Sequence, residues 1–305
     1  MKKICSIIYN PNSSGVNGTK VIDEMKEILN EKYEVKTFES NKSGLGSKYV
    51  KEANKISDLI ISIGGDGTFN DIIRGIYNEE QKALLSHIPM GTVNDLGRTF
   101  NLNNNPIESL KRILNGKVTN IDVLTINGVP YGYVAAFGYL TGVSSETPEQ
   151  LKKALKKSAY ILYGGTKALK KPEVYNVKYE IDNKEYNVQC ILGAFSNSKG
   201  FAGIEMYSKF KLNDGKFEVM FIPNISKLEI LKALKEVVVD KKTIPEIEKI
   251  IYHRTDNIKL YFEKIPTDDW TLDGEKHKLP KEIEIKIGKQ IKMLLPNEAV
   301  DTLCK

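Results

Sequence analysis

The segment IISIGGDGTFNDIIRGI, Ile60–Ile76, constrains the fold more than any other part of this sequence. It opens with a continuous apolar run, which is typical of a short strand that is buried on both faces of a sheet. Apolar residues then recur at helical spacing, and Thr68 with Asp71 matches a capping box, so we expect a helix that begins at Thr68. A strand followed at once by a helix is the unit of a parallel α/β sheet.

Three glycines and one carboxylate form the turn between that strand and that helix. Gly64, Gly65 and Gly67 let the backbone come close to a ligand, and the free N–H groups of a helix N-terminus favour phosphate. Asp66 would repel phosphate unless it holds Mg²⁺ or acts as a base. Because ligands of open α/β sheets bind at the carboxyl ends of the strands, this turn predicts a nucleotide site.

The rest of the chain divides into two kinds of sequence. Up to about Asp122, strand-like segments (3–9, 33–38, 58–63, 83–89) alternate with helix-like segments (21–29, 68–77, 107–116), the last closed by Gly116. Beyond it come short alternating strands (174–181, 186–194, 215–223, 257–263, 282–287, 290–295) and two helical stretches (148–171, 227–239), which indicates an antiparallel sheet or sandwich. With 305 residues we expect two domains, 1–124 (joined by 296–305) and 125–295 with a helical insertion at 147–171.

Two further loops follow apolar strands in the first domain. HIPMGTVNDLGRTF ends a strand at Pro89 and pairs Thr92 with Asp95 as a second capping box, while IIYNPNSSG is rich in Asn, Ser and Gly. Each loop alone is compatible with ordinary turn chemistry. The three together favour one nucleotide site, since each ends a strand of the same sheet.

Composition narrows the class of protein without naming it. The chain is 41% hydrophobic and 28% charged, so it can bury a core, and its net charge of +6 mildly favours an anionic partner without indicating nucleic acid. Three scattered cysteines form no metal or redox spacing and suggest a reducing cytoplasm. No apolar run approaches the roughly 20 residues that span a bilayer.

Several familiar catalytic templates do not occur. The sequence has no GxxxxGK[ST] P-loop, no complete GxGxxG, no protein-kinase HRD set and no HExxH zinc motif. Its nucleotide site must therefore be built in another way.

An ordered series of motifs resembles the bacterial soluble diacylglycerol kinase-like lipid kinases. GGDGTFND is similar to the GGDGT loop that these enzymes share with sphingosine kinases, NAD kinases and phosphofructokinases. NPNSSG, PMGTVNDLGR, FKLNDGKFEV and WTLDGE are similar to further motifs of the lipid kinases, in the same order, from Asn10 to Glu275. Two departures stand out: Ser14 replaces the usual glycine of NPxSG, and Asn213 replaces the first Asp of DDG.

The resemblance implies a phosphofructokinase-like (NAD kinase-like) α/β domain that binds ATP and a β-sandwich domain that binds the lipid. It implies Glu275 as the proton acceptor, and Asp66 and Asp122 as carboxylates tied to the catalytic Mg²⁺ and its waters. The residues expected to line the ATP site are Asn10, Pro11, Asn12, Ser13, Ser14, Ser40, Gly64, Gly65, Asp66, Gly67, Thr68, Phe69, Asn70 and Thr92.

Two of these assignments compete with plainer interpretations. Asp273-Gly274 alone would be read as a hairpin turn, and the resemblance is what singles out Glu275. Likewise Asp214 alone would be read as a surface turn, whereas the resemblance implies a second, structural Mg²⁺ bound by Asp214 and the carbonyls of Lys211 and Lys216.

We therefore expect an ATP-dependent lipid kinase that is cytoplasmic and peripheral at the membrane, with diacylglycerol as the leading acceptor. Another lipid or a soluble alcohol as acceptor, and a nucleotide-binding regulator without catalysis, stay open, as does a homodimer. The lysines of a predicted helix (Lys152, Lys153, Lys156 and Lys157) are expected to contact an anionic membrane surface.

Overall fold

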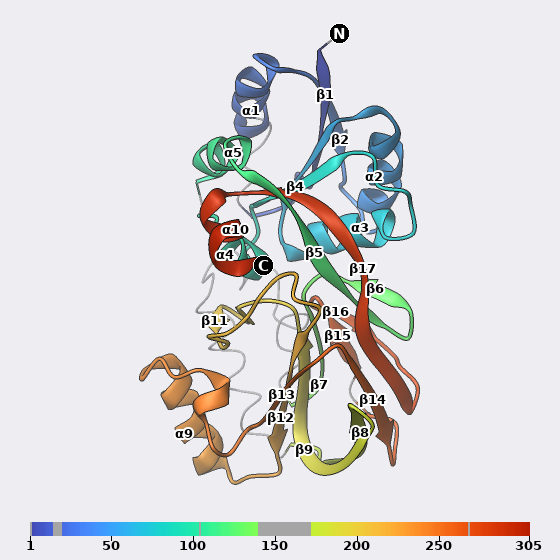
Figure 1. Ribbon diagram of the computed structural model, residues 1–305, viewed down its shortest axis with the longest axis vertical. Coiled ribbons are helices and arrows are strands. Elements are labelled where there is room, and N and C mark those ends of the chain that lie inside the picture. The colour runs from blue at the N-terminus through green and yellow to red at the C-terminus, as the bar shows by residue number, and fades with distance from the viewer. Residues whose placement is uncertain (1, 15–19, 104, 140–171, 268) are drawn as a thin grey trace. The chain divides into compact units, whose positions relative to one another are not determined.

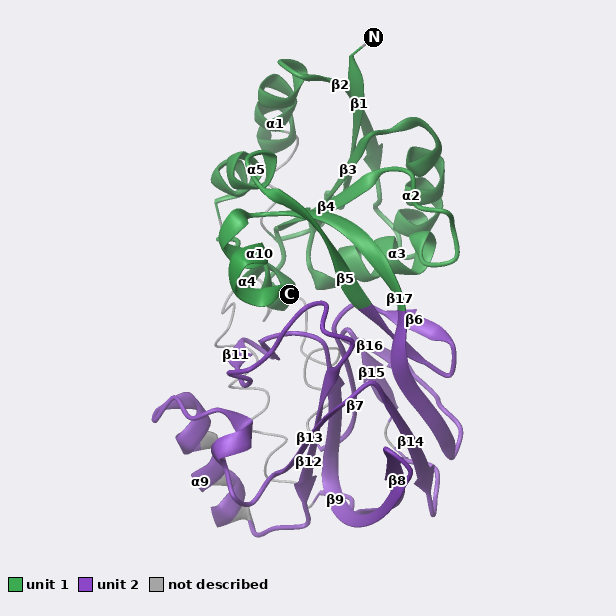
Figure 2. Cartoon of the chain, in the orientation of Figure 1, with its two compact units in different colours: residues 1–122, 289–305 green, residues 123–288 purple. Residues whose placement is uncertain are grey.

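The computed structural model describes residues 2–14, 20–103, 105–139, 172–267 and 269–305 (Figure 1). The helical insertion predicted at 147–171, with its four lysines, lies outside these residues. The chain divides into two compact units, coloured separately in Figure 2: unit 1 is Met1–Asp122 with Lys289–Lys305, and unit 2 is Val123–Gly288. The sequence predicts these divisions slightly later in the chain, after residues 124 and 295. In the described residues, no helix is both long enough and apolar enough to cross a bilayer.

Unit 1 is built on a parallel sheet in the order β2-β1-β3-β4. Its strands are β1 (Lys3–Tyr9), β2 (Tyr33–Glu39), β3 (Leu59–Gly64) and β4 (Leu84–Pro89). All six residues of β3 are buried, as expected of a central strand that is covered on both faces. The end of β17 (Glu282–Leu295) adds to β4 in parallel through Met293 and Leu85. The predicted parallel α/β arrangement is confirmed.

Helices cover both faces of this sheet (Figure 1). α1 (Lys20–Asn30) and α5 (Pro106–Leu114) lie on one side, and α2 (Leu45–Ile56) and α3 (Asp66–Ile76) on the other. The short α4 (Asp95–Thr99) contacts β4, and α10 (Asn297–Leu303) is joined to α5 by an Arg112–Glu298 ion pair of 3.2 Å. The sequence reading missed α2, because this helix buries only Gly46, Val50, Ala53 and Asn54 and so has a sparse apolar stripe.

Both capping boxes that we predicted in unit 1 are wrong. α3 begins at Asp66 with Gly65 as N-cap, and the Asp71 carboxylate accepts the N–H of Gly44 at 2.9 Å. α4 begins at Asp95, and its N-cap is Asn94 in the left-handed conformation. Likewise α5 ends at Leu114 with Asn115 as its C-cap, and Gly116 is not an αL cap because its φ is not positive. Gly116 is needed for space instead, since a Cβ there would lie 2.0 Å from the Leu295 carbonyl oxygen.

Unit 2 is rich in antiparallel strands, as predicted, in the order β16-β15-β7-β9-β8-β14-β17. The strands are β5 (Lys117–Ile126), β6 (Val129–Tyr131), β7 (Val134–Gly138), β8 (Tyr175–Ile181), β9 (Lys184–Ser196), β10 (Gly200–Phe201), β11 (Ile204–Glu205), β12 (Phe217–Pro223), β13 (Ile251–Thr255), β14 (Asn257–Phe262), β15 (Trp270–Leu272) and β16 (Glu275–His277). Helix α9 spans Lys227–Val238, and a 3₁₀ helix spans Ile244–Glu246. The two strands expected at 282–287 and 290–295 are one continuous strand, β17.

Aromatic side chains fill the core of unit 2. Phe137 packs against Phe195, Phe262 and Trp270 with ring centroids 6.4, 4.8 and 4.9 Å away. Trp270 is 1% exposed and belongs to β15, so the short β15–β16 hairpin is anchored in this core through its first strand.

Candidate functional site

The loops that follow β1, β2, β3 and β4 meet along one edge of the unit 1 sheet, which we call the carboxyl edge. Backbone bonds join each loop to its neighbour. The N–H of Asn10 donates to Ile63 at 3.0 Å, that of Ser40 to Tyr9 at 2.8 Å, and that of Met90 to Gly64 at 2.6 Å. Parallel strands impose this meeting, since their carboxyl ends point the same way.

The first loop holds its own shape and reaches the last one. Asn10 accepts the N–H of Asn12 on its side-chain oxygen at 2.9 Å and the N–H of Ser13 on its carbonyl at 3.1 Å. The Ser14 hydroxyl lies 3.3 Å from the Thr92 hydroxyl, so NPNSSG and PMGTVND contact each other as the prediction of one site requires. Pro11, between Asn10 and Asn12, lies on the same turn.

Glycines allow the third and fourth loops to come together. A Cβ on Gly91 would lie 2.6 Å from the Cα of Gly65, and a Cβ on Gly64 would lie 2.3 Å from the Thr68 hydroxyl. Gly67 differs, because a Cβ there would meet nothing within 4 Å. The first turn of α3 therefore presents an open, exposed surface at Gly67, while the N–H groups of Thr68 and Phe69 donate to the Gly65 carbonyl.

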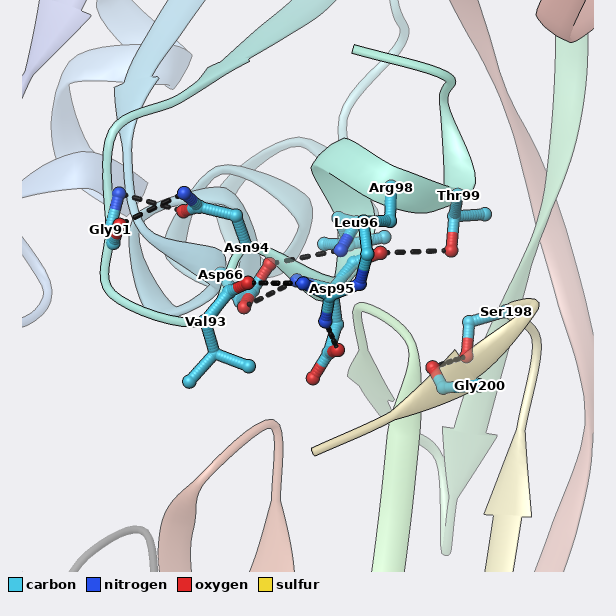
Figure 3. A network of polar contacts seen from close by, with 10 residues as sticks. All are labelled: Asp66, Gly91, Val93, Asn94, Asp95, Leu96, Arg98, Thr99, Ser198 and Gly200. Atoms are coloured by element: carbon cyan, nitrogen blue, oxygen red, sulfur yellow. Dashed lines mark hydrogen bonds and ion pairs between the residues drawn. The ribbon is translucent and has the colours of Figure 1, made fainter. Parts of the chain in front are cut away.

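The Asp66 carboxylate joins the third loop to the fourth (Figure 3). Its two oxygens accept the N–H groups of Asp95 at 3.1 Å and Leu96 at 3.0 Å, at the start of α4. Asn94, the residue before α4, closes its own loop by exchanging bonds of 2.7 and 2.9 Å with the backbone of Gly91. Asp66 thus fixes α4 against α3, a positioning role that the sequence did not reveal.

Asp95 is a carboxylate of this edge that we did not select from the sequence. Its side chain is 3% exposed and pairs with the Arg98 guanidinium, which also donates to the Val93 carbonyl at 2.7 Å. We had used Asp95 only as a capping-box partner. Its position three residues after Thr92, in the motif that resembles the lipid kinases, was the available signal.

Phe69 and Asn70 face the core. Phe69 is fully buried and packs on His87 and Phe100 at centroid distances of 5.1 and 5.9 Å, while Asn70 is 1% exposed. Burial lowers the pKa of His87 to about 3, so its ring is neutral, and it bonds the Ser62 hydroxyl at 2.8 Å. These two residues, which the sequence predicted in the ATP site, are thus buried side chains of α3.

Asp122 is the last residue of unit 1 before the chain enters unit 2. It is 3% exposed and accepts a bond of 2.7 Å from the side-chain amide of Gln290 on β17. A buried carboxylate needs hydrogen-bond donors, and Gln290 supplies one to Asp122.

The predicted base, Glu275, opens β16 in unit 2. Asp273 and Gly274 form a two-residue turn with φ of 52° and 89°, and Leu272 pairs with Glu275 across it. The Glu275 side chain is 40% exposed and lies 3.9 Å from the His277 ring. Asp273 is 6% exposed and accepts three backbone N–H groups. Of the two motif carboxylates, only Glu275 is exposed enough to meet a substrate.

Asp214 already has a cationic partner. One of its oxygens accepts from Arg254 at 2.6 Å and the other accepts the N–H of Lys216 at 3.2 Å, while Arg254 also donates to the buried Glu218 at 2.9 Å. Burial raises the pKa of Glu218, against the hydrogen bond from Tyr252 and the charge of Arg254. The described residues show no group of three metal-ligating side chains. Both oxygens of Asp214 thus have partners within the protein, and the structural Mg²⁺ with Lys211 and Lys216 stays a prediction from the resemblance.

Known proteins resemble this chain over most of its length. Residues 5–126 match the family described as "Diacylglycerol kinase catalytic domain". A protein of Staphylococcus epidermidis named "Diacylglycerol kinase" is 31% identical over 233 residues, which cover 75% of this chain and 73% of that protein. One of the same name from Staphylococcus aureus is 28% identical over 307 residues, which cover 99% and 95%.

Solved structures share the fold. The crystal structure of a diacylglycerol kinase from Bacillus anthracis has a TM-score of 0.77 and 21% identity, with 98% of each chain covered. A second crystal structure from the same organism has a TM-score of 0.83 and 24% identity, covering 98% of this chain and 97% of that one.

Proposed function

This chain belongs to the diacylglycerol kinase family, and from that premise we propose that it transfers the γ-phosphoryl group of ATP to a lipid hydroxyl. Diacylglycerol is the first candidate acceptor, which would make phosphatidic acid the product. The relatives carry that substrate in their names, and the proposal extends it to this chain.

The carboxyl edge is the observation that carries the proposal. Loops from four strands meet there, Gly65 and Gly91 let them pack closely, and Gly67 leaves the first turn of α3 open. A phosphate group at this helix N-terminus would be stabilised by backbone N–H groups and by the helix dipole. The edge therefore favours a nucleoside triphosphate bound by its phosphates.

The carboxylates of unit 1 fit Mg²⁺ by their chemistry, because hard cations prefer oxygen ligands. Asp66 and Asp122, the two carboxylates that the resemblance ties to the ion, would supply oxygens directly or through water. When bound, Mg²⁺ would neutralise the charge of the phosphates. Asp66 in addition orients α4 through the N–H groups that it accepts.

Glu275 is proposed as the general base. Its carboxylate would take the proton of the acceptor hydroxyl as that oxygen bonds to the γ-phosphorus, while the bond from phosphorus to the bridging oxygen breaks and ADP leaves. Partial exposure suits this role, because a base must reach a proton of the substrate.

An acceptor that stays in a bilayer requires the enzyme to dock at the membrane. We therefore propose peripheral binding to anionic lipid, by electrostatic attraction of lysines, at about 1 kcal/mol for each lysine near the surface.

A phosphoryl-transfer assay tests the proposal. Radiolabelled ATP with Mg²⁺ would be offered mixed micelles that contain diacylglycerol, monoacylglycerol, ceramide, a sphingoid base or a polyprenol, with glycerol as soluble control. We expect label in phosphatidic acid. Glu275→Gln should lower kcat by about 10²–10⁴-fold while ATP affinity stays unchanged.

Label in another lipid would keep the kinase and change its acceptor. Label only in glycerol would refute a lipid kinase, and ATP binding without any labelled product would indicate a regulator without catalysis. If Glu275→Gln lost ATP binding as much as turnover, Glu275 would be a nucleotide contact and not the base.

A further inference from the structure

The β15–β16 hairpin is fastened at its turn by one buried side chain, Asp273. Its carboxylate accepts the N–H of Gly132 at 2.5 Å on one oxygen and those of Tyr133 and Val134, both at 2.9 Å, on the other. The N–H of Asp273 donates in return to the Val134 carbonyl at 2.8 Å. Four bonds thus join a two-residue turn to the segment that links β6 to β7.

That segment is itself fixed to the sheet. The Tyr133 carbonyl accepts the N–H of Asn197, just beyond β9, at 2.9 Å, and β7 pairs with β9 along its whole length. Tyr131, the last residue of β6, is fully buried, and its pKa is raised by burial and by the nearby Asp273 charge. The carboxylate therefore ties the turn to a segment that is hydrogen-bonded to the central strands of the unit 2 sheet.

Glu275 stands two residues beyond this attachment. In contrast to Asp273, its side chain is 40% exposed. Its strand, β16, is three residues long and pairs with β15 alone in the described sheet, and the Asp273-Gly274 turn joins these two strands directly before Glu275. Charge-assisted bonds to backbone N–H groups are about twice as strong as neutral ones, so the Asp273 carboxylate is well suited to hold the turn in place.

From this geometry we infer that Asp273 is a positioning residue for Glu275: its carboxylate fixes the turn that places the proposed base. The inference rests on the proposed function of Glu275. Asp273 does not exchange protons with the substrate, because its oxygens are occupied by the three N–H groups. Its effect on the reaction passes through the position of Glu275, and misplacement of a reacting group by about 1 Å can cost about 10²-fold in rate.

A double-mutant cycle tests this assignment. Asp273→Asn keeps the shape of the side chain but replaces one acceptor oxygen by a donor, so at least one N–H loses its partner. We expect kcat to fall by about 10²-fold, with the KM for ATP within about twofold of wild type. In the Glu275→Gln background the same substitution should cause almost no further loss, because residues that act as a unit are not additive.

Asp182→Asn is the matched control. Asp182 also begins a two-residue turn, between β8 and β9, with φ of 50°, but it is exposed. Its substitution should leave kcat unchanged. The emission of Trp270, the one tryptophan of the sequence, reports whether the core beside the hairpin stays folded.

Gly274→Ala moves the same turn in a second way. Gly274 has a φ of 89°, which an alanine adopts only with strain, and the substitution leaves the carboxylate of Asp273 in place. Its kcat should also fall, and it takes the place of Asp273→Asn in the cycle if that variant does not fold.

Wild-type kcat in folded Asp273→Asn, beside an inactive Glu275→Gln, would refute the positioning role alone. An equal further loss of kcat in the Glu275→Gln background would also refute it, since Asp273 would then act independently of Glu275. Full turnover in Glu275→Gln would overturn the proposed base and this inference together.

Discussion

Each unit contains an Asp-Gly pair whose aspartate accepts backbone N–H groups, but the two aspartates have different roles. Asp66-Gly67 follows β3, and Asp273-Gly274 follows β15; both carboxylates accept backbone N–H groups from another segment of the chain. Asp273 is 6% exposed and closes a turn whose two residues have positive φ. Asp66 is half-buried, starts a helix, and precedes an exposed Gly67 whose φ is not positive.

The difference shows that similar motifs can assign a structural role and a proposed chemical role to two different carboxylates or to one. In unit 2 the aspartate is buried, and the glutamate two residues later, the proposed base, is partly exposed. In unit 1 the aspartate both orients α4 and stands at the open end of α3, where a ligand can approach. Substitutions that affect one role and not the other test this comparison.

The largest effect is expected for Asp66→Asn. An amide cannot provide both acceptor oxygens and carries no charge for a cation, so we expect turnover to fall by about 10²–10³-fold. The loss of one charge-assisted bond should lower the free energy of unfolding by about 1–3 kcal/mol. Kinetics with Mg²⁺ and ATP, together with thermal denaturation, measure the two effects.

Asp71→Asn provides the control for Asp66. Asp71 lies on the same helix and also accepts a backbone N–H, that of Gly44, but its neighbours are Gly46 and Ser47 of α2. It should lose stability without a comparable loss of turnover. Similar turnover in Asp66→Asn and in wild type would remove Asp66 from the site.

We expect acid to lower the stability of unit 1 in particular, because the buried His87 belongs to that unit. The folded protein holds this ring neutral, with a pKa of about 3, whereas the unfolded chain takes up a proton near pH 6.5. Its contribution to stability is therefore present above pH 6.5 and is lost as the pH falls towards 3, by at most about 1.4 kcal/mol per pH unit.

The measurement compares nucleotide binding with the emission of Trp270 during acid titration. Since His87 packs on Phe69 beneath α3, binding should fail before the core around Trp270 changes. His87→Gln does not titrate, so its stability should depend less on pH in this range. An unchanged pH dependence in that variant would assign the acid sensitivity to other groups.

The smallest effects on stability are expected at the two glycines. Gly67 has open space for a Cβ, so Gly67→Ala should raise the free energy of unfolding by about 0.5 kcal/mol or slightly more, as expected within a helix. Gly274→Ala should lower it by about 1–2 kcal/mol because of its positive φ. The methyl group at residue 67 should nonetheless raise the KM for ATP, if phosphate binds against that turn. Tighter ATP binding in Gly67→Ala would place the phosphates elsewhere.

Local patterns in the sequence predicted the class of fold and the three loops that meet at the carboxyl edge of unit 1. The apolar run of β3 and the helical period after it required a buried strand followed by a helix, and parallel strands bring their carboxyl ends to one edge. Local patterns suffice for this, because strand burial and helix periodicity are set by neighbours in the chain. The paired hairpin turn at Asp273-Gly274 could be read in the same way.

The hydrogen-bond partners of the polar side chains, in contrast, became known only from the tertiary structure. Thr68 and Asp71 match a capping box, but Asp71 finds the N–H of Gly44, and Asp66 takes its partners from α4. Asp273 closes a turn that any Asp-Gly pair could form, yet it is buried because residues 132–134 lie against it. Hydrogen-bond partners far apart in the chain are set by how strands and loops pack, and the residue types within a motif do not encode that packing.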